Sequence, residues 1–162
     1  EDAAFIGLLF GWNGVLVVAR QIRMRGLIKK AALTTVCAAG LAFYVIGYSV
    51  LASFSGWFWY FLAVTVITLG EVIHSPASNA LISNLASHLG GPRRQGSYIG
   101  FAQFVGVMGG LTASIGGGYL LEHSRNVHVA ILWMTAAVAA TVAALGYLLY
   151  RKKVPSQDLL GI

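Results

Sequence analysis

The chain has 162 residues, of which 57% are hydrophobic and only 10% are charged, and its mean hydropathy is +0.75. A soluble domain carries about 25% charged residues, so this composition excludes an ordinary soluble protein and indicates an integral membrane protein. The net charge of +6 does not indicate a nucleic-acid partner, because the basic residues stand in short clusters between apolar runs. The single cysteine, Cys37, excludes an intrachain disulfide.

Five apolar segments predict an all-α fold, a polytopic membrane helical bundle with five transmembrane helices. The predicted helices cover residues 3–20, 31–52, 57–86, 96–121 and 129–150, and together they form one bundle over residues 1–162. The turn at residues 53–56 is short, so the second and third helices should be antiparallel neighbours. A polar loop is expected over residues 87–94. The acidic start without an initiator methionine suggests a piece of a longer protein.

The basic residues predict the orientation of the bundle. Ten of the eleven lysines and arginines lie in the first loop, the third loop and the tail, whereas Arg125 lies in another loop. Short loops rich in lysine and arginine stay in the cytoplasm. We therefore expect Glu1 outside and a cytoplasmic C-terminus at Ile162, in a multi-pass protein of the plasma (inner) membrane.

The third segment carries the residues on which the predicted function depends. Glu71 is the only acidic residue inside a long apolar segment, and an ionisable group at membrane depth indicates a functional site. On a helix, the polar residues of this segment share one face, which should meet a wet cavity or other protein. These residues are Glu71, His74, Ser75, Ser78, Asn79 and Ser83. Pro76 leaves the Val72 carbonyl without its N–H partner and is a candidate hinge.

Glu71 is the candidate proton-coupling residue. A carboxyl group that faces the two sides of the membrane in turn could take up a proton on one side and release it on the other. His74, one helical turn further on, is either a proton relay with Glu71 or an interhelical hydrogen-bonding residue. Glu71 also has a structural alternative, as an acid hydrogen-bonded to a neighbouring helix.

Polar residues divide the five segments into two kinds. The first, third and fourth segments carry acids or amides, so they should meet one another or line a cavity. Asn13, Ser75, Asn79 and Gln103 are the candidate substrate-cavity residues, and for Asn13 and Gln103 the alternative is hydrogen bonding between helices. The second and fifth segments lack such groups and are expected to be peripheral, facing lipid on most sides.

Small and aromatic residues add two further features. The fourth segment has a ridge of small residues that includes Gly106, Gly110 and Gly117. Such a ridge either lets two backbones approach closely or lets the helix bend or slide. The aromatic run at residues 57–61 is typical of a membrane interface, with substrate stacking as the alternative.

Motifs for enzymatic chemistry do not occur in the sequence. It contains no Gly-x-x-x-x-Gly-Lys-Ser/Thr, His-Glu-x-x-His or Gly-x-Ser-x-Gly pattern, and one cysteine cannot build a thiolate metal site. His74 and Ser75 point about 100° apart on a helix, so they are a poor base–nucleophile pair. We therefore expect no enzyme, no cofactor and no metal.

The order of these motifs resembles the C-terminal half of a major facilitator superfamily transporter, in the branch of drug:proton antiporters. The resemblance rests on Gly70-Glu71 with Pro76, on Arg-Arg-Gln-Gly-Ser-Tyr-Ile-Gly at residues 93–100, on Gly-Gly-Gly-Tyr-Leu at residues 116–120, and on Trp12-Asn13-Gly14. The second of these runs is similar to the entry of the family's eleventh helix. The resemblance implies that the five segments are helices eight to twelve of a twelve-helix fold.

The sequence departs from that family in two respects. The loop over residues 20–30 has no acid where the family often keeps an aspartate and a Gly-Arg-Arg pattern for a gating salt bridge. The seventh helix and the N-terminal half are also missing, and the family's transport path lies between two halves. We therefore expect this stretch to need that missing half as a partner in transport.

The resemblance implies a secondary active transporter of a small, lipophilic solute that works by alternating access and is proton-coupled. Its partners would be the lipid bilayer, the small-molecule substrate, protons and the missing N-terminal half, with no nucleic acid. The alternative is a non-transporting membrane scaffold or assembly subunit, in which the helical bundle is a docking surface.

Overall fold

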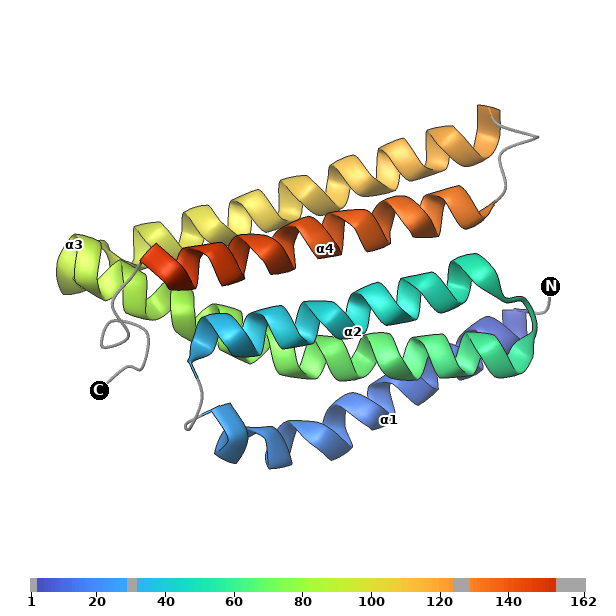
Figure 1. Ribbon diagram of the computed structural model, residues 1–162, viewed down its shortest axis with the longest axis horizontal. Coiled ribbons are helices and arrows are strands. Elements are labelled where there is room, and N and C mark those ends of the chain that lie inside the picture. The colour runs from blue at the N-terminus through green and yellow to red at the C-terminus, as the bar shows by residue number, and fades with distance from the viewer. Residues whose placement is uncertain (1–2, 29–31, 124–128, 154–162) are drawn as a thin grey trace.

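The computed structural model describes residues 3–28, 32–123 and 129–153. Within these ranges the chain forms the helices α1 (Ala3–Ile28), α2 (Leu33–Ser53), α3 (Trp57–His123) and α4 (Val129–Lys153) (Figure 1). Gly56, with a φ of 117°, occupies the left-handed region that glycine tolerates and makes the tight turn from α2 into α3 possible. The predicted all-α fold is confirmed.

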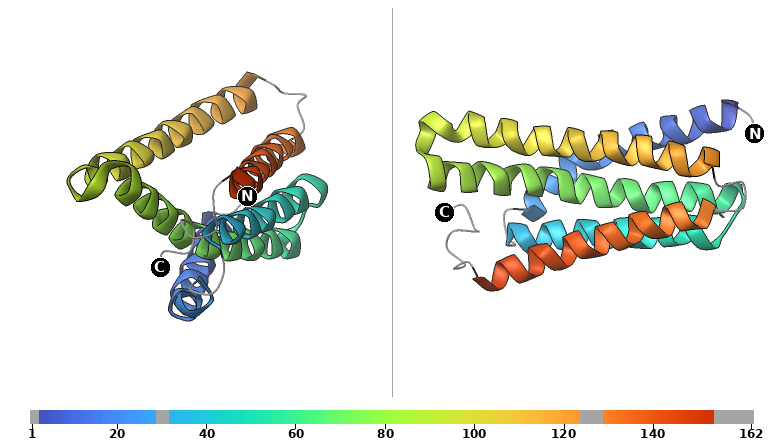
Figure 2. Two further views of the ribbon diagram at one scale, coloured as in Figure 1. Left: turned by 60° about the vertical axis from the view of Figure 1, so that its left-hand side comes forward. Right: turned by 90° about the horizontal axis from the view of Figure 1, so that it is seen from above.

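Helix α3 contains two apolar spans that run antiparallel to each other (Figure 2). We call Trp57–His88 the first arm and Arg94–Tyr119 the second arm. Both arms, together with Leu33–Ser53 and Val129–Lys152, are long and apolar enough to cross a membrane, and Ala4–Ala19 is a shorter apolar helix. All five predicted apolar helical segments are therefore present, and the chain is a multi-pass membrane protein.

The structure differs from the sequence prediction at two helix boundaries. The backbone is helical through residues 87–94, where a loop was predicted, although the chain reverses direction between the two arms. Helix α1 continues to Ile28, beyond the predicted end at residue 20. Arginine is a good helix former, so the basic stretch after the apolar segment prolongs the helix instead of ending it.

Helix α2 and the first arm meet along a seam of mostly small residues. The seam positions alternate spacings of four and three residues on both helices, which is the pattern of antiparallel helices packed at a shallow angle. They are Leu33, Cys37, Gly40, Tyr44 and Gly47 on α2, and Ala63, Ile67, Gly70, His74, Ala77 and Leu81 on α3. A Cβ atom at Gly40 would lie 2.8 Å from the backbone nitrogen of His74, so only glycine permits this approach.

The prediction that the second segment is peripheral is wrong for α2. This helix packs against both α3 and α4, and Thr34 and Cys37 are completely buried in it. The prediction took polar content as the sign of a central helix. Small side chains determine the position of α2 instead, because they let it come closer to its two neighbours than bulky residues would.

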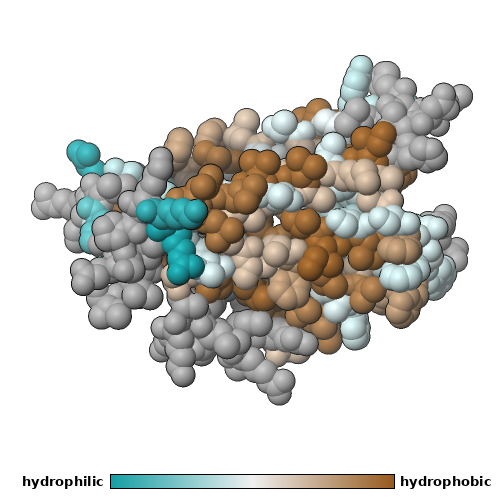
Figure 3. All heavy atoms as spheres, viewed as in Figure 1, coloured by the Kyte–Doolittle hydropathy of each residue, from teal (hydrophilic) through white to brown (hydrophobic). Residues whose placement is uncertain are grey.

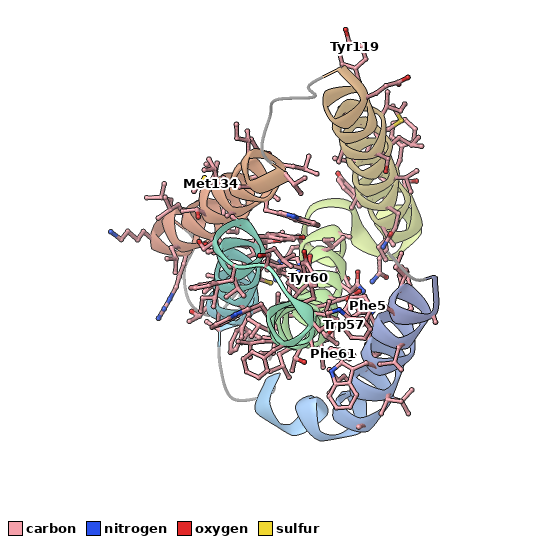
Figure 4. All side chains as sticks on the ribbon, turned by 90° about the vertical axis from the view of Figure 1, so that its right-hand side faces the viewer. Phe5, Trp57, Tyr60, Phe61, Tyr119 and Met134 are labelled. Atoms are coloured by element: carbon pink, nitrogen blue, oxygen red, sulfur yellow. The ribbon has the colours of Figure 1, made fainter. Side chains whose placement is uncertain are left out.

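Helix α1 packs against the first arm through aromatic rings at one end of the molecule (Figure 4). The ring of Phe5 is 4.2 Å from that of Trp57, and it also lies near Tyr60 and Phe61. Two helical turns further along α1, the Trp12 indole Nε1 donates a hydrogen bond of 2.9 Å to Thr65 Oγ1. The expected contact between the first and third segments is thus confirmed.

The second arm of α3 stands away from this packing. None of its residues from Arg94 to Tyr119 is buried, and Phe101 is 68% exposed. A Cβ atom added at Gly106 or Gly110 would meet nothing within 4 Å. The expected packing of the fourth segment against the first and third segments is therefore not found among the described residues, and a hydrogen bond from Gln95 to Ser83 joins the second arm to the first at the reversal. The arm thus exposes many large apolar side chains. On the face shown in Figure 3, apolar surface in brown spreads over several helices.

The helix termini gather at two opposite ends of the molecule. At one of these, α1 terminates, α2 begins, α3 reverses direction and α4 terminates (Figure 1). There the Arg151 guanidinium of α4 donates a hydrogen bond of 2.9 Å to Thr35 Oγ1 of α2. Hydrophilic atoms on the face shown in Figure 3 also gather at this end. The predicted termini, Glu1 and Ile162, lie outside the described residues.

Candidate functional site

An open line of polar residues runs along the first arm. Glu71, Ser75 and Asn79 follow one another at four-residue spacing, so they lie one above the other on the helix surface. All three are exposed. Thr68, three residues before Glu71, continues the same line and is buried. We call Glu71, Ser75 and Asn79 the open polar line.

Asn13 of α1 lies beside Thr68, at one end of the open polar line. The hydroxyl of Thr68 lies 2.7 Å from Asn13 Oδ1 and also 2.7 Å from the Val64 carbonyl oxygen. Both oxygens are acceptors and the Thr68 hydroxyl has one hydrogen, so the two acceptors share this donor, and the bond to Asn13 Oδ1 joins α1 and α3. Asn13 is half-buried there. The structure thus places Asn13 both in an interhelical hydrogen bond and next to the open polar line.

His74 and Ser78 point away from the open polar line, towards α2 and α4. The His74 ring lies edge-on to Tyr44 of α2 at 6.4 Å and to Tyr147 of α4 at 5.9 Å. The Ser78 hydroxyl is 3.5 Å from the Tyr147 hydroxyl, and the Cys37 thiol is also hydrogen-bonded to Tyr147. Tyr147 therefore ties the polar residues of three helices together.

Tyr44 connects this group to Glu71. The Glu71 carboxylate is close enough to interact electrostatically with both Tyr44 and Tyr48. The Tyr44 ring also lies 6.4 Å from the His74 ring. We call Tyr44, Tyr48, His74 and Tyr147 the histidine–tyrosine cluster. Its Tyr48 ring stacks at 6.0 Å on Trp133 of α4.

The polar stripe predicted from sequence thus divides into two environments. The open polar line is exposed, and His74 with Ser78 belongs to the interface of α2, α3 and α4. Glu71 and His74 are titratable, and the Tyr44 hydroxyl can donate and accept a hydrogen bond. The arrangement therefore contains groups that can hold protons. In the described part of the chain, no group of three His, Cys, Asp or Glu residues could hold a metal ion.

The remaining predicted site residues lie apart from both groups. Gln103, Gly106 and Gly110 are exposed on the second arm. At Gly117, an added Cβ atom would lie 3.5 Å from the Leu132 side chain of α4. Pro76 is exposed on the first arm, directly after the open polar line residue Ser75.

Three tyrosines of the site were not among the predicted site residues. Tyr44, Tyr48 and Tyr147 belong to the two segments that were expected to be peripheral. A signal was present in the sequence, since Tyr44 lies near the middle of an apolar segment and a buried tyrosine hydroxyl usually finds a hydrogen-bond partner.

The chain is similar to bacterial membrane proteins. It is 32% identical over 96 residues to multidrug resistance protein MdtH of Escherichia coli O157:H7, a match that covers 57% of this chain and 23% of that protein. It is 24% identical over 151 residues to YttB of Bacillus subtilis (strain 168), an uncharacterized MFS-type transporter, and that match covers 92% of this chain and 36% of YttB. The chain thus spans well under half the length of the curated relatives it matches.

The similarity supports a resemblance to part of an MFS-type transporter and does not single out the drug:proton antiporter branch. No protein-family model matches the chain, and no solved structure matches it.

Proposed function

We propose that this chain is part of a secondary active transporter that moves a small, lipophilic solute across the membrane by alternating access, coupled to protons. The open polar line carries the proposal, because it places an exposed carboxyl group on a helix long enough to span the membrane. Lipid cannot solvate a carboxylate, so this side of the first arm must face water or another part of the protein. The similarity to MdtH and YttB supports transport as the use of that side.

The same proposal accounts for the uncovered second arm. Gly106, Gly110 and Gln103 would face the rest of the transporter, its N-terminal half, across the solute path, and Gly117 would keep the arm close to α4. Asn13, Ser75, Asn79 and Gln103 would line that path. The transporter would lie in the plasma (inner) membrane with its C-terminus in the cytoplasm, since lysine and arginine are concentrated at that end.

Glu71 is the proposed site of proton exchange, with His74 as the second member of the relay. A proton would pass between them through the Tyr44 hydroxyl, because Tyr44 neighbours both residues. Pro76 is the proposed hinge, since the first arm lacks one backbone hydrogen bond at Val72 just beside Glu71.

The test is Glu71→Gln in the full-length protein, reconstituted in liposomes with an imposed pH gradient. The variant keeps the size of the side chain and removes its titration, so we expect solute exchange to continue and uphill transport to stop. Glu122→Gln is the matched control, because Glu122 is an exposed acid outside the open polar line. Uphill transport by Glu71→Gln at the wild-type rate would show that Glu71 has a structural role.

A membrane scaffold is the second candidate function, and the exposed apolar surface of the second arm favours it. In that case the second arm would dock another protein instead of facing a solute path. The length of the gene separates the two candidates. About seven further spans encoded upstream would support the transporter, and a gene for these five segments alone would support the scaffold.

A further inference from the structure

An apolar groove lies between the first arm of α3 and α4, outside the open polar line. Its volume is about 400 Å³, within the range of roughly 300–1,000 Å³ that is usual for small-molecule sites. Leu81 and Leu85 form one wall, and Gly146 and Tyr150 form part of the other. The groove is open to its surroundings, so in a membrane a lipid chain can enter it from the side.

Cationic side chains follow the groove directly. Tyr150 is the last groove residue on α4, and Arg151 and Lys152 come next, both exposed. With a helical rise of about 1.5 Å per residue, Arg151 lies about 7.5 Å beyond Gly146 along the helix axis. Around the helix axis, Arg151 lies about 40° from the groove residue Tyr147, whereas Lys152 lies about 140° from it. An apolar chain lying in the groove would thus bring a polar group at its end to Arg151.

Arg151 is in a position to bind an anion. Arg151 donates one hydrogen bond to Thr35, and a guanidinium group has five N–H donors, so donors remain for a further acceptor. The acids in the described part of the chain, Glu71 and Glu122, belong to the middle of the first arm and to the far end of α3. Neither therefore competes with an anion for Arg151 and Lys152.

We propose that this groove binds an anionic phospholipid, with an acyl chain along Leu81, Leu85 and Gly146 and the phosphate beside Arg151. Charge complementarity selects this occupant, because a neutral apolar solute would make no use of the Arg151 guanidinium. Basic pockets between membrane helices on the cytoplasmic side are suited to such head groups. The lipid would also connect α3 to α4, which otherwise contact each other little along this stretch.

Native mass spectrometry of the full-length protein tests the proposal. The protein in detergent is incubated with equal amounts of phosphatidylglycerol and phosphatidylcholine that carry the same acyl chains. A cation near the head group favours an anionic lipid, so we expect phosphatidylglycerol to be retained about fivefold more than phosphatidylcholine. Arg151→Gln should bring this ratio close to parity, and Lys152→Gln should keep it. Thr35→Val, which removes the partner of Arg151 but no charge, should keep the ratio.

A second variant tests the groove itself. A side chain at Gly146 has open space around it, so Gly146→Leu fills the groove without a clash and should lower the retention of both lipids. Gly7→Leu on α1 is the control, because Gly7 is equally open and does not line the groove. Equal retention of the two lipids by the wild type would overturn the proposal. Retention unchanged in both Gly146→Leu and Arg151→Gln would also overturn it, since another part of the protein would then occupy the groove.

Discussion

Gly40 of α2 and Gly70 of α3 face each other so closely that a Cβ atom on Gly70 would lie 2.7 Å from the Gly40 carbonyl oxygen. Neither backbone can move away from the other without separating α2 from the first arm of α3. We expect Gly40→Ala to lower the free energy of unfolding by about 1–3 kcal/mol, the usual cost of overpacking. Denaturant titration in mixed micelles measures the change. Gly146→Ala, which meets open space, should cost nothing, and equal effects of the two substitutions would contradict the close approach.

Tyr147 joins three helices, so its ring and its hydroxyl should contribute separately. Tyr147→Phe keeps the ring contact with His74 and removes the hydroxyl contacts with Ser78 and Cys37. Interhelical hydrogen bonds in membrane proteins are worth about 0.6 kcal/mol on average, and we expect a loss of that size. Tyr147→Ala should cost clearly more in the same unfolding assay. A loss no larger for alanine than for phenylalanine would show that the ring does not pack as described.

The link between Asn13 and Thr68 can be measured with a double-mutant cycle. Asn13→Ala and Thr68→Val each remove one member, and the double variant should be more stable than the sum of the two losses predicts. We expect a coupling energy of about 0.6 kcal/mol, typical of such a bond. Strict additivity would mean that the 2.7 Å contact contributes no stability.

The orientation can be tested by labelling introduced cysteines in sealed cells. Ser55 lies in the turn between α2 and α3, and Ser87 lies near the reversal of α3, and both are exposed. An impermeant maleimide added outside should label Ser55→Cys and should label Ser87→Cys only after the membrane is opened. The native Cys37 can stay in place because it is completely buried. Labelling of both positions from one side would contradict the topology.

The proposed relay predicts different effects for two neighbouring tyrosines. Tyr44 interacts electrostatically with Glu71 and its ring contacts the His74 ring, whereas Tyr48 interacts with Glu71 and stacks on Trp133. Tyr44→Phe removes the hydroxyl of the proposed relay, so we expect proton-driven transport to slow while solute exchange stays at the wild-type rate. Tyr48→Phe should leave both rates unchanged. Equal rates for all three proteins would place the proton path elsewhere.

The helical class of the fold and its five apolar segments could be predicted from the sequence, because hydrophobic length alone defines a membrane span. Which helices pack against one another could not be predicted from the sequence. Apolar residues have no preference among apolar partners, so the central place of α2 depends on close packing at Gly40 and Gly47. Their seven-residue spacing was a visible sign of this seam.

The candidate site was predicted in part. The polar residues of the first arm were identified, but they were assigned to one face. His74 and Asn79 are about 140° apart around a helix, which is wide enough for two different neighbours. The structure accordingly places His74 against Tyr147 and leaves Asn79 exposed. The tyrosines from α2 and α4 could be assigned to the site only once the packing of these helices was known.

The second arm is joined to the first across the reversal, where the Gln95 amide donates a hydrogen bond of 2.8 Å to Ser83 Oγ. From there the arm extends 26 residues to Tyr119, a length of about 39 Å at 1.5 Å per residue. The second arm can therefore pivot as one rigid helix about the reversal beside Ser83. A tilt of about 10° at the reversal would move the far end of the arm by about 7 Å. A small angular change at one membrane surface thus becomes a displacement as wide as a small solute at the other surface.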